Sequence, residues 1–285
     1  MEKLPEDLSK KRNAQEGSGM LKKSNTGNIR ISDTSAKILA ENVKAVYSVK
    51  KVRNTAEEEY RYQTGEDRMK EERMSNYVKL CEEWAQRFLK MDQADLHKRV
   101  PELKEENGFL TIIHFGRKYG VSLEDGSIRS LDGQREPDTT EMLNIYTLLG
   151  YAKEGAFIMD KWVPFADLRN ARPFAPAYQI GETDVFSATF SGHEKELREA
   201  FQKLDGRELP QGDVGYEIRA FDCMPMRFFF WERDEEFEAQ GNILFDYSAT
   251  DFNHVESAVS IADSGIKRLA ELAGVPLRGK SFQMR

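Results

Sequence analysis

The run PMRFFFWE, residues 225–232, constrains the fold most, because its apolar side chains occupy successive positions rather than alternate ones. A strand that is apolar on both faces is buried on both faces, so this run predicts a central strand of a sheet. Two β-rich runs flank it in the sequence, VGYEIRAFD before it and NILFDYS after it. Short turns join these runs, which favours antiparallel pairing. The sequence therefore predicts a sheet built around residues 225–232.

Other segments carry the marks of helices and further strands. The runs FLTIIHF, YGVSL and SIRSL predict an antiparallel meander, and DVFSATF at residues 184–190 predicts another strand. Apolar residues at helical spacing predict a helix over residues 77–89. Capping boxes predict three more helix starts. The pairs are Asp138 with Glu141, Ser191 with Glu194 (which places His193 in a first helical turn), and Asn253 with Glu256.

Strands and helices in mixed order predict an α+β fold, with an antiparallel or mixed central sheet and flanking helices. We expect residues 74–285 to form a single globular domain. Residues 1–73 are expected to be a polar N-terminal extension, with a disordered arm followed by an amphipathic helix near residues 33–53. The extension is either an upstream start outside the native domain or a partner-binding element, in which case residues 33–53 would serve assembly.

The charge is unevenly distributed, and this narrows the class of partner. Residues 1–73 hold 16 Lys and Arg against 13 Asp and Glu, which leaves 26 against 36 for residues 74–285. An acidic body disfavours nucleic acid and anionic lipid, because both need a positive surface. No apolar run is long enough to span a membrane, and the charged N-terminus lacks the apolar core of a secretory signal, so we expect a cytoplasmic protein.

Two cysteines, Cys81 and Cys223, lie far apart, so the chain carries no intrinsic iron–sulfur motif. The sequence also lacks the GxGxxG, GxSxG and HExxH patterns of common enzyme sites. No cofactor is therefore assigned from a motif, and whether the protein is an enzyme stays open.

The most informative stretch for chemistry is FFFWERDEEFEAQGNILFDYSATDFNHVE, residues 228–256. If its two strands pair, carboxylates and an imidazole are expected to converge at neighbouring strand ends. Such a group could bind a divalent metal, or could raise one carboxyl pKa for acid/base chemistry. The alternative is that these residues are solvated turns and helix caps. The candidate residues are Glu232, Asp234, Glu235, Glu236, Asp246, Asp251, His254 and Glu256, with Trp231, Trp162 and Phe165 as aromatic pocket candidates.

The segments YTLLGYAKEGAFIMDKWVPFADL, MRFFFWERDEEFEAQGNILFDYSA and the following HVE helix resemble the family called domain of unknown function 3786. The resemblance covers about residues 76–270 and implies a context in anaerobic bacteria and archaea. Members of that family occur beside, or fused to, the four-cysteine iron–sulfur domain associated with corrinoid methyl-transfer proteins. The resemblance therefore implies a corrinoid or iron–sulfur protein partner, with a corrinoid or a divalent metal as the cofactors to test, but it implies no reaction.

Two functions follow as hypotheses. The first is a binding or accessory protein of anaerobic corrinoid and iron–sulfur redox metabolism. The second is a metal-assisted or acid/base enzyme that uses the acidic residues between Glu232 and Glu256.

Overall fold

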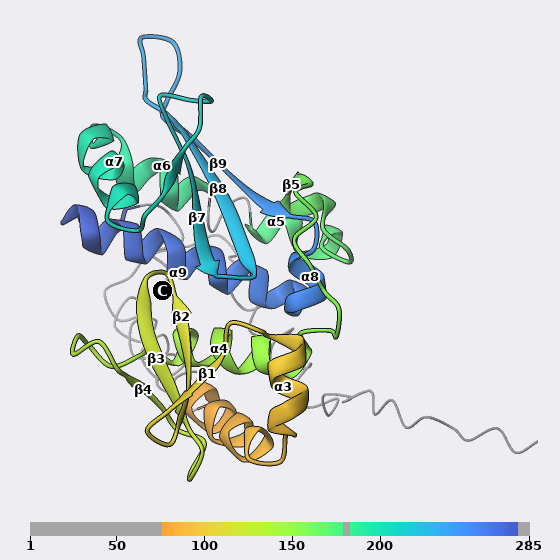
Figure 1. The fold of residues 1–285 in the computed structure, drawn as a ribbon. Helices are drawn as coiled ribbons and strands as arrows, with labels where there is room; N and C mark the ends of the chain where they lie inside the picture. Colours follow the sequence, from red (N-terminus) through yellow and green to blue (C-terminus); the bar gives the residue numbers. More distant parts are fainter. Residues whose placement is uncertain (1–75, 179–182, 279–285) are drawn as a thin grey trace, which may run out of the picture.

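The computed structural model describes residues 76–178 and 183–278 (Figure 1). The predicted arm and amphipathic helix within residues 1–73 lie outside the described residues. Helices and two antiparallel sheets make up the described part, which confirms the predicted α+β class. Among the described residues, no helix combines the length and the apolar character that a membrane crossing requires.

The first sheet has four antiparallel strands in chain order. They are β1 (Lys104–Glu106), β2 (Phe109–His114), β3 (Arg117–Ser122) and β4 (Ile128–Ser130). Phe115 and Gly116 join β2 to β3, with φ values of 44° and 73°. Positive φ at both positions is typical of a type I′ turn, whose twist suits a two-residue hairpin. The predicted meander is therefore confirmed.

The second sheet has five antiparallel strands in the order β5-β9-β8-β7-β6. They are β5 (Trp162–Pro164), β6 (Arg207–Glu208), β7 (Val214–Phe221), β8 (Met224–Trp231) and β9 (Gln240–Asp246). β8 lies at the centre and is buried at nearly every position, as its apolar sequence predicts.

Helices surround both sheets. Residues 76–88 form the first described helix, close to its predicted bounds. The predicted capping box of α4 is present, since Asp138 and Glu141 each accept a hydrogen bond from the other's backbone N–H. The remaining elements are α3 (Gln93–Arg99), α4 (Thr139–Tyr151), η1 (Phe165–Asp167), η2 (Arg172–Phe174), α5 (Ala175–Tyr178), α6 (Asp184–Phe190), α7 (Glu194–Gln202), α8 (Ala249–Phe252) and α9 (Val255–Ala273).

Helix α9 runs through the middle of the molecule and contacts α4, α6, α7 and α8 (Figure 1). Gly265 lets it approach both sheets closely. A Cβ atom there would lie 2.9 Å from the Cζ atom of Phe115 and 3.2 Å from that of Phe228. Because Phe115 belongs to the turn of the first sheet and Phe228 to the centre of the second, α9 packs against both.

The prediction of a strand at residues 184–190 is wrong, because this segment is helix α6. Its buried side chains are Val185, Phe186, Thr189 and Phe190, a spacing that fits a helix face. Phe186 packs edge-on against Phe190 and against Phe228 of β8. β-branched and aromatic composition favoured a strand locally, but burial against the second sheet selects the helix.

Two of the predicted caps are also wrong. The Ser191 hydroxyl donates to Glu232 instead of capping α7, and His193 occupies the N-cap position of that helix rather than its first turn. At α9 the N-cap is His254, whose ring accepts from the N–H of Glu256, whereas Asn253 accepts from the N–H of His254.

Candidate functional site

The β8–β9 hairpin separates the predicted acidic residues. Trp231 pairs with Gln240, so the segment that contains Glu232 and the next three acidic residues follows β8 immediately. Asp246 lies at the other end of β9, about 20 Å away at roughly 3.4 Å per residue. The predicted convergence at neighbouring strand ends is therefore wrong, because an antiparallel hairpin places the end of β8 beside the start of β9.

Glu232 and Asp234 bind backbone groups. Glu232 accepts hydrogen bonds from the Ser191 hydroxyl and from the N–H groups of Gly192 and Arg233. Partial burial opposes ionisation, but these hydrogen bonds outweigh it and lower the pKa of Glu232. Asp234 accepts from the N–H groups two and three residues later. Glu235 and Glu236 lie exposed in the same connection.

Asp246 is buried and holds a loop in place. Its carboxylate accepts hydrogen bonds from the N–H of Met159 at 3.0 Å and of Lys161 at 3.1 Å. It also accepts from the backbone N–H and the hydroxyl of Ser248. A carboxylate with several N–H donors fixes the backbone that provides them. We call residues 157–161 the apolar loop, since Phe157, Ile158 and Met159 are all exposed.

Asp251 pairs with two cations, Lys153 and Arg169, which precede and follow the apolar loop in the sequence. It lies 2.7 Å from the Lys153 ammonium and also binds the Arg169 guanidinium. These two partners lower the pKa of Asp251 against the opposing effect of burial. Arg169 in turn lies over the ring of Tyr247, 4.9 Å from its centroid. Asp251 therefore ties the segments on either side of the apolar loop to α8.

Of the predicted acidic set, His254 and Glu256 come together at the start of α9. Their side chains are 3.8 Å apart, and the ring centroids of His254 and Tyr151 are 5.4 Å apart. Burial raises the pKa of Glu256 and lowers that of His254. The Tyr151 hydroxyl oxygen is buried and has no hydrogen-bond partner among the described residues. This small group retains the raised carboxyl pKa that acid/base chemistry needs.

The aromatic pocket candidates lie in three different places. Phe165 is buried and stacks on Tyr178, with ring centroids 4.4 Å apart. Trp162 is half-buried beneath Arg227, whose guanidinium carbon is 3.8 Å from the ring centroid. Trp231 lies at the far end of β8 and is 39% exposed. These three side chains do not form one pocket.

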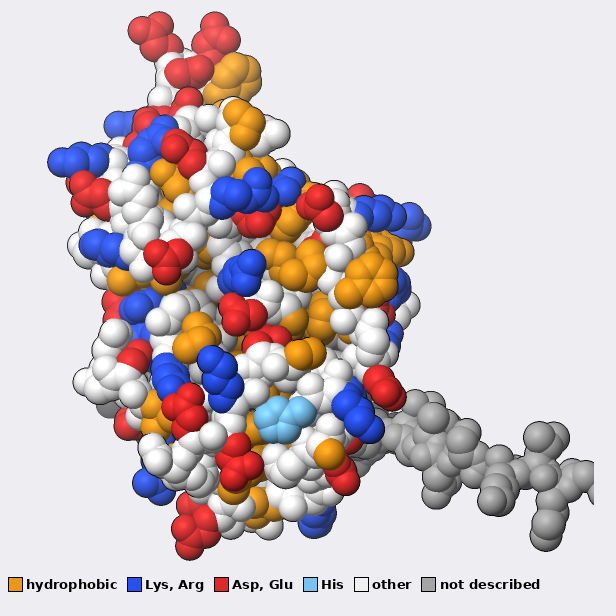
Figure 2. All heavy atoms as spheres, viewed as in Figure 1, with side chains coloured by type: hydrophobic (Ala, Val, Ile, Leu, Met, Phe, Trp, Pro, Cys, Tyr) orange, Lys and Arg blue, Asp and Glu red, His pale blue; other side chains and the backbone are white. Residues whose placement is uncertain are grey.

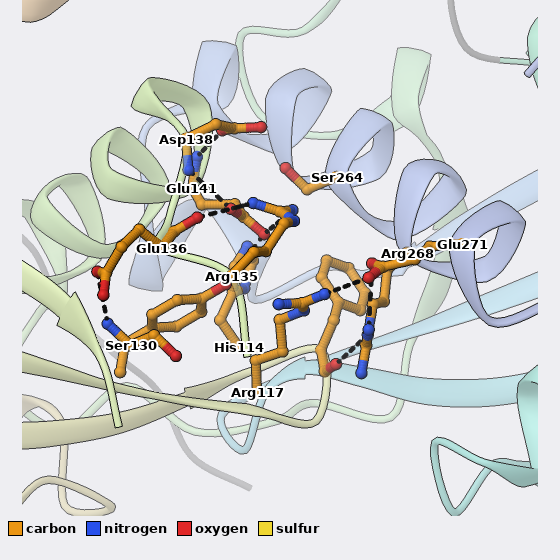
Figure 3. A network of polar contacts seen from close by, with 12 residues as sticks. His114, Arg117, Ser130, Arg135, Glu136, Asp138, Glu141, Ser264, Arg268 and Glu271 are labelled. Carbon is orange, nitrogen blue, oxygen red and sulfur yellow. Dashed lines mark hydrogen bonds and ion pairs between the residues drawn. The ribbon is translucent and has the colours of Figure 1, made fainter. Parts of the chain in front are cut away.

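Figure 3 shows a polar network between β3, α4 and α9, of which the sequence indicated only the capping box of Asp138 and Glu141. Arg117 is 1% exposed and pairs with Glu271. Its Nε and Nη1 atoms are buried without a hydrogen-bond partner among the described residues. Arg135 makes two hydrogen bonds to Glu141, which also accepts from the Tyr119 hydroxyl at 3.0 Å. No local sequence signal marks Arg117, because its partner lies on α9.

The same network reaches the junction of the two sheets through Asn144. Its side-chain amide donates to the hydroxyl of Ser264 at 3.0 Å and faces Nε2 of His114 at 3.4 Å. Within the described ranges, no group of three or more His, Cys, Asp or Glu side chains is arranged to hold a metal ion.

Comparison with protein families gives one match. The family model described as Domain of unknown function (DUF3786) matches residues 96–268, which is more than half of the chain. The chain belongs to the DUF3786 family. The DUF3786 match confirms the resemblance seen in the sequence and spans all the candidate site residues. The chain matches no curated protein and no solved structure.

Proposed function

We propose that this DUF3786 chain is a binding or accessory protein of anaerobic corrinoid and iron–sulfur redox metabolism. The observation that supports the proposal is the apolar loop. Phe157, Ile158 and Met159 are 66%, 40% and 37% exposed. Three successive large apolar side chains facing water favour a protein-binding surface over a folding role.

The backbone of the apolar loop is fixed before any partner binds. Asp246 is buried and accepts hydrogen bonds from the N–H groups of Met159 and Lys161. A rigid loop loses little conformational entropy on binding, so more of its apolar contact becomes affinity. Hydrophobic side chains gather on the face drawn in Figure 2, over the region of β5, α5 and α8. Asp246 therefore holds the backbone of the proposed binding surface in place, and its own carboxylate is buried.

The partner we propose is the four-cysteine iron–sulfur domain associated with corrinoid proteins. The apolar loop lies within residues 146–168, one of the segments that carry the family resemblance. That resemblance implies a protein working beside such a domain, and the chain itself has two separated cysteines that bind no cluster alone.

Anoxic calorimetric titration tests this proposal, with a purified corrinoid protein that carries its four-cysteine domain. The double variant Phe157→Ser, Ile158→Ser is expected to weaken binding by about tenfold or more, because two apolar contacts are lost. Val78→Ser is the matched control, since Val78 is 45% exposed on the helix of residues 76–88, outside the apolar loop. Equal affinity of wild type and the double variant would rule out the apolar loop, and no binding by the wild type would rule out the partner.

A second candidate is acid/base catalysis at the start of α9. The supporting observation is the approach of His254 to Glu256 beside the buried Tyr151 hydroxyl, with the pKa of Glu256 raised by burial. A carboxyl with a raised pKa keeps its proton to a higher pH than an ordinary glutamate, which is what a general acid needs. Turnover of small esters or glycosides that is lost in Glu256→Gln, with an unchanged circular dichroism spectrum, would support catalysis. Turnover that survives this substitution would exclude Glu256.

A further inference from the structure

The connection between β8 and β9 projects from the body of the molecule (Figure 1). We call residues 232–239 the acidic hairpin. Phe237 is 61% exposed near its tip, and Trp231 at its base is 39% exposed. Figure 2 shows acidic and hydrophobic side chains side by side at this projection. Two exposed aromatic rings on a projecting hairpin favour a contact surface, because such rings contribute large apolar areas on binding.

The acidic hairpin has a defined conformation. The Asp234 carboxylate accepts from the N–H groups of Glu236 at 2.8 Å and of Phe237 at 2.7 Å. The N–H of Asp234 donates to the carbonyl oxygen of Phe237 at 3.0 Å. At the base, the N–H of Glu232 donates to the Asp213 carboxylate at 2.8 Å. These hydrogen bonds therefore hold the backbone of the turn at Phe237 in one conformation.

The charge of the acidic hairpin specifies what can cover it. Residues 232–239 contain five Asp and Glu against one Arg. Contact with a neutral apolar surface would remove these carboxylates from water without compensation, whereas a basic apolar surface would pair with them. The occupant must therefore combine Lys or Arg with apolar side chains.

One segment of the chain itself has this composition. Residues 33–53 contain five Lys and Arg against two Asp and Glu. Their apolar residues recur near helical spacing at Ile38, Leu39, Val43, Val46 and Tyr47. The helix that this spacing predicts would be marginal in water when isolated, and it would gain stability by burying its apolar face. We propose that residues 33–53 dock on the acidic hairpin of the same molecule, with Phe237 against their apolar face.

The connecting chain is long enough for this contact. Residues 54–75 separate the basic segment from the first described helix. When extended, they span up to about 70 Å, whereas a body of this size is about 45 Å across. The acidic hairpin is therefore within reach.

Zero-length carbodiimide cross-linking of the full chain tests the contact, with mass spectrometry to locate the links. We expect links between Lys44, Lys50 or Lys51 and Glu235, Glu236 or Glu238. Phe237→Ser removes the aromatic contact and keeps every charge, so the yield of these links should fall about tenfold. Val78→Ser is the control, because it removes an exposed apolar side chain from a helix that takes no part in the contact.

Val43→Asp tests the other side of the contact and should lower the same yield, because it places a charge on the apolar face. A mixture of unlabelled and ¹⁵N-labelled chains separates contacts within one molecule from contacts between molecules. Links confined to single chains support the proposal. Absence of the links, an unchanged yield in Phe237→Ser, or links that join labelled to unlabelled chains would overturn it.

Discussion

The imidazole of His114 stacks on the ring of Phe221, with centroids 4.4 Å apart and planes 18° from parallel. Its Nδ1 atom lies 3.0 Å from the carbonyl oxygen of Ala220, so this nitrogen carries the proton and donates. The next residue, Phe115, donates its N–H to the same oxygen. Since His114 ends β2 and Ala220 lies in β7, a neutral histidine joins the two sheets.

This junction predicts destabilisation by acid. Burial lowers the pKa of His114 from 6.5 to about 4. The unfolded chain takes up this proton as the pH falls below about 6.5, whereas the folded chain resists until about pH 4. The contribution of His114 to stability is therefore complete above pH 6.5 and declines between pH 6.5 and 4. The loss is on the order of 3 kcal/mol, and urea unfolding at pH 7 and pH 4.5 measures it.

His114→Phe removes the titrating group and should reduce the difference in unfolding free energy between these two pH values, even if the variant is less stable at pH 7. His97→Gln is the control, because His97 lies on α3, away from the sheet junction. A pH dependence in His114→Phe as steep as that of the wild type would contradict the assignment.

The pairing of the buried Arg117 with the partly exposed Glu271 predicts an asymmetric response to substitution. Glu271→Gln leaves the Arg117 charge buried without its partner, which should cost about 3–5 kcal/mol of unfolding free energy. In Arg117→Met, Glu271 keeps Arg268 at 3.1 Å and is 44% exposed, so the cost should be smaller. The double variant should be more stable than Glu271→Gln alone. Urea midpoints check the order, and a Glu271→Gln variant as stable as the wild type would disprove it.

Asp246→Asn should loosen the apolar loop. The amide group cannot accept from all the donors that face the carboxylate, and loss of hydrogen bonds to a buried charge costs about 1.5–3 kcal/mol each. Hydrogen exchange of the Met159 and Lys161 amides should therefore accelerate. Asp167→Asn, at an exposed aspartate of η1, is the control. Unchanged exchange in Asp246→Asn would mean that other contacts hold the loop.

Gly265→Ala should destabilise the protein although it raises helix propensity. In an unobstructed helix this change stabilises by about 1 kcal/mol. Here the added methyl group would lie 2.9 Å from Phe115, and overpacking of this kind costs about 1–3 kcal/mol. Thermal unfolding shows whether Gly265→Ala raises or lowers the stability of the protein. A raised midpoint would show that α9 has room to move.

Local sequence signals predicted the elements whose stability is decided locally. The capping box of Asp138 and Glu141 and the central position of β8 follow from spacing and apolar content alone. Helix α6 was missed because Val185, Phe186 and Phe190 favour strands by composition, and their helical spacing matters only once β8 is beside them.

The candidate site was harder to predict, because its geometry depends on how the strands pair and on residues that are distant in the sequence. Whether Glu232 meets Asp246 depends on the direction of the β8–β9 hairpin, which moves one of them to the far end of the sheet. The burial of Arg117 depends on Glu271, which is 154 residues later. His254 and Glu256 were easier to place, because both lie at the start of one helix and are therefore close in the sequence and in the structure.

The central position of α9 has a consequence for how the chain is made. The first sheet ends with β4 at Ser130, but the helix that packs on its turn begins at Val255. On the ribosome, that sheet is synthesised long before the surface that will cover it. Contacts between such distant segments slow folding, because a long loop must close before they form. During synthesis, Phe115 and its neighbours therefore stay uncovered until α9 emerges, which makes this the interval in which chaperones would bind the chain.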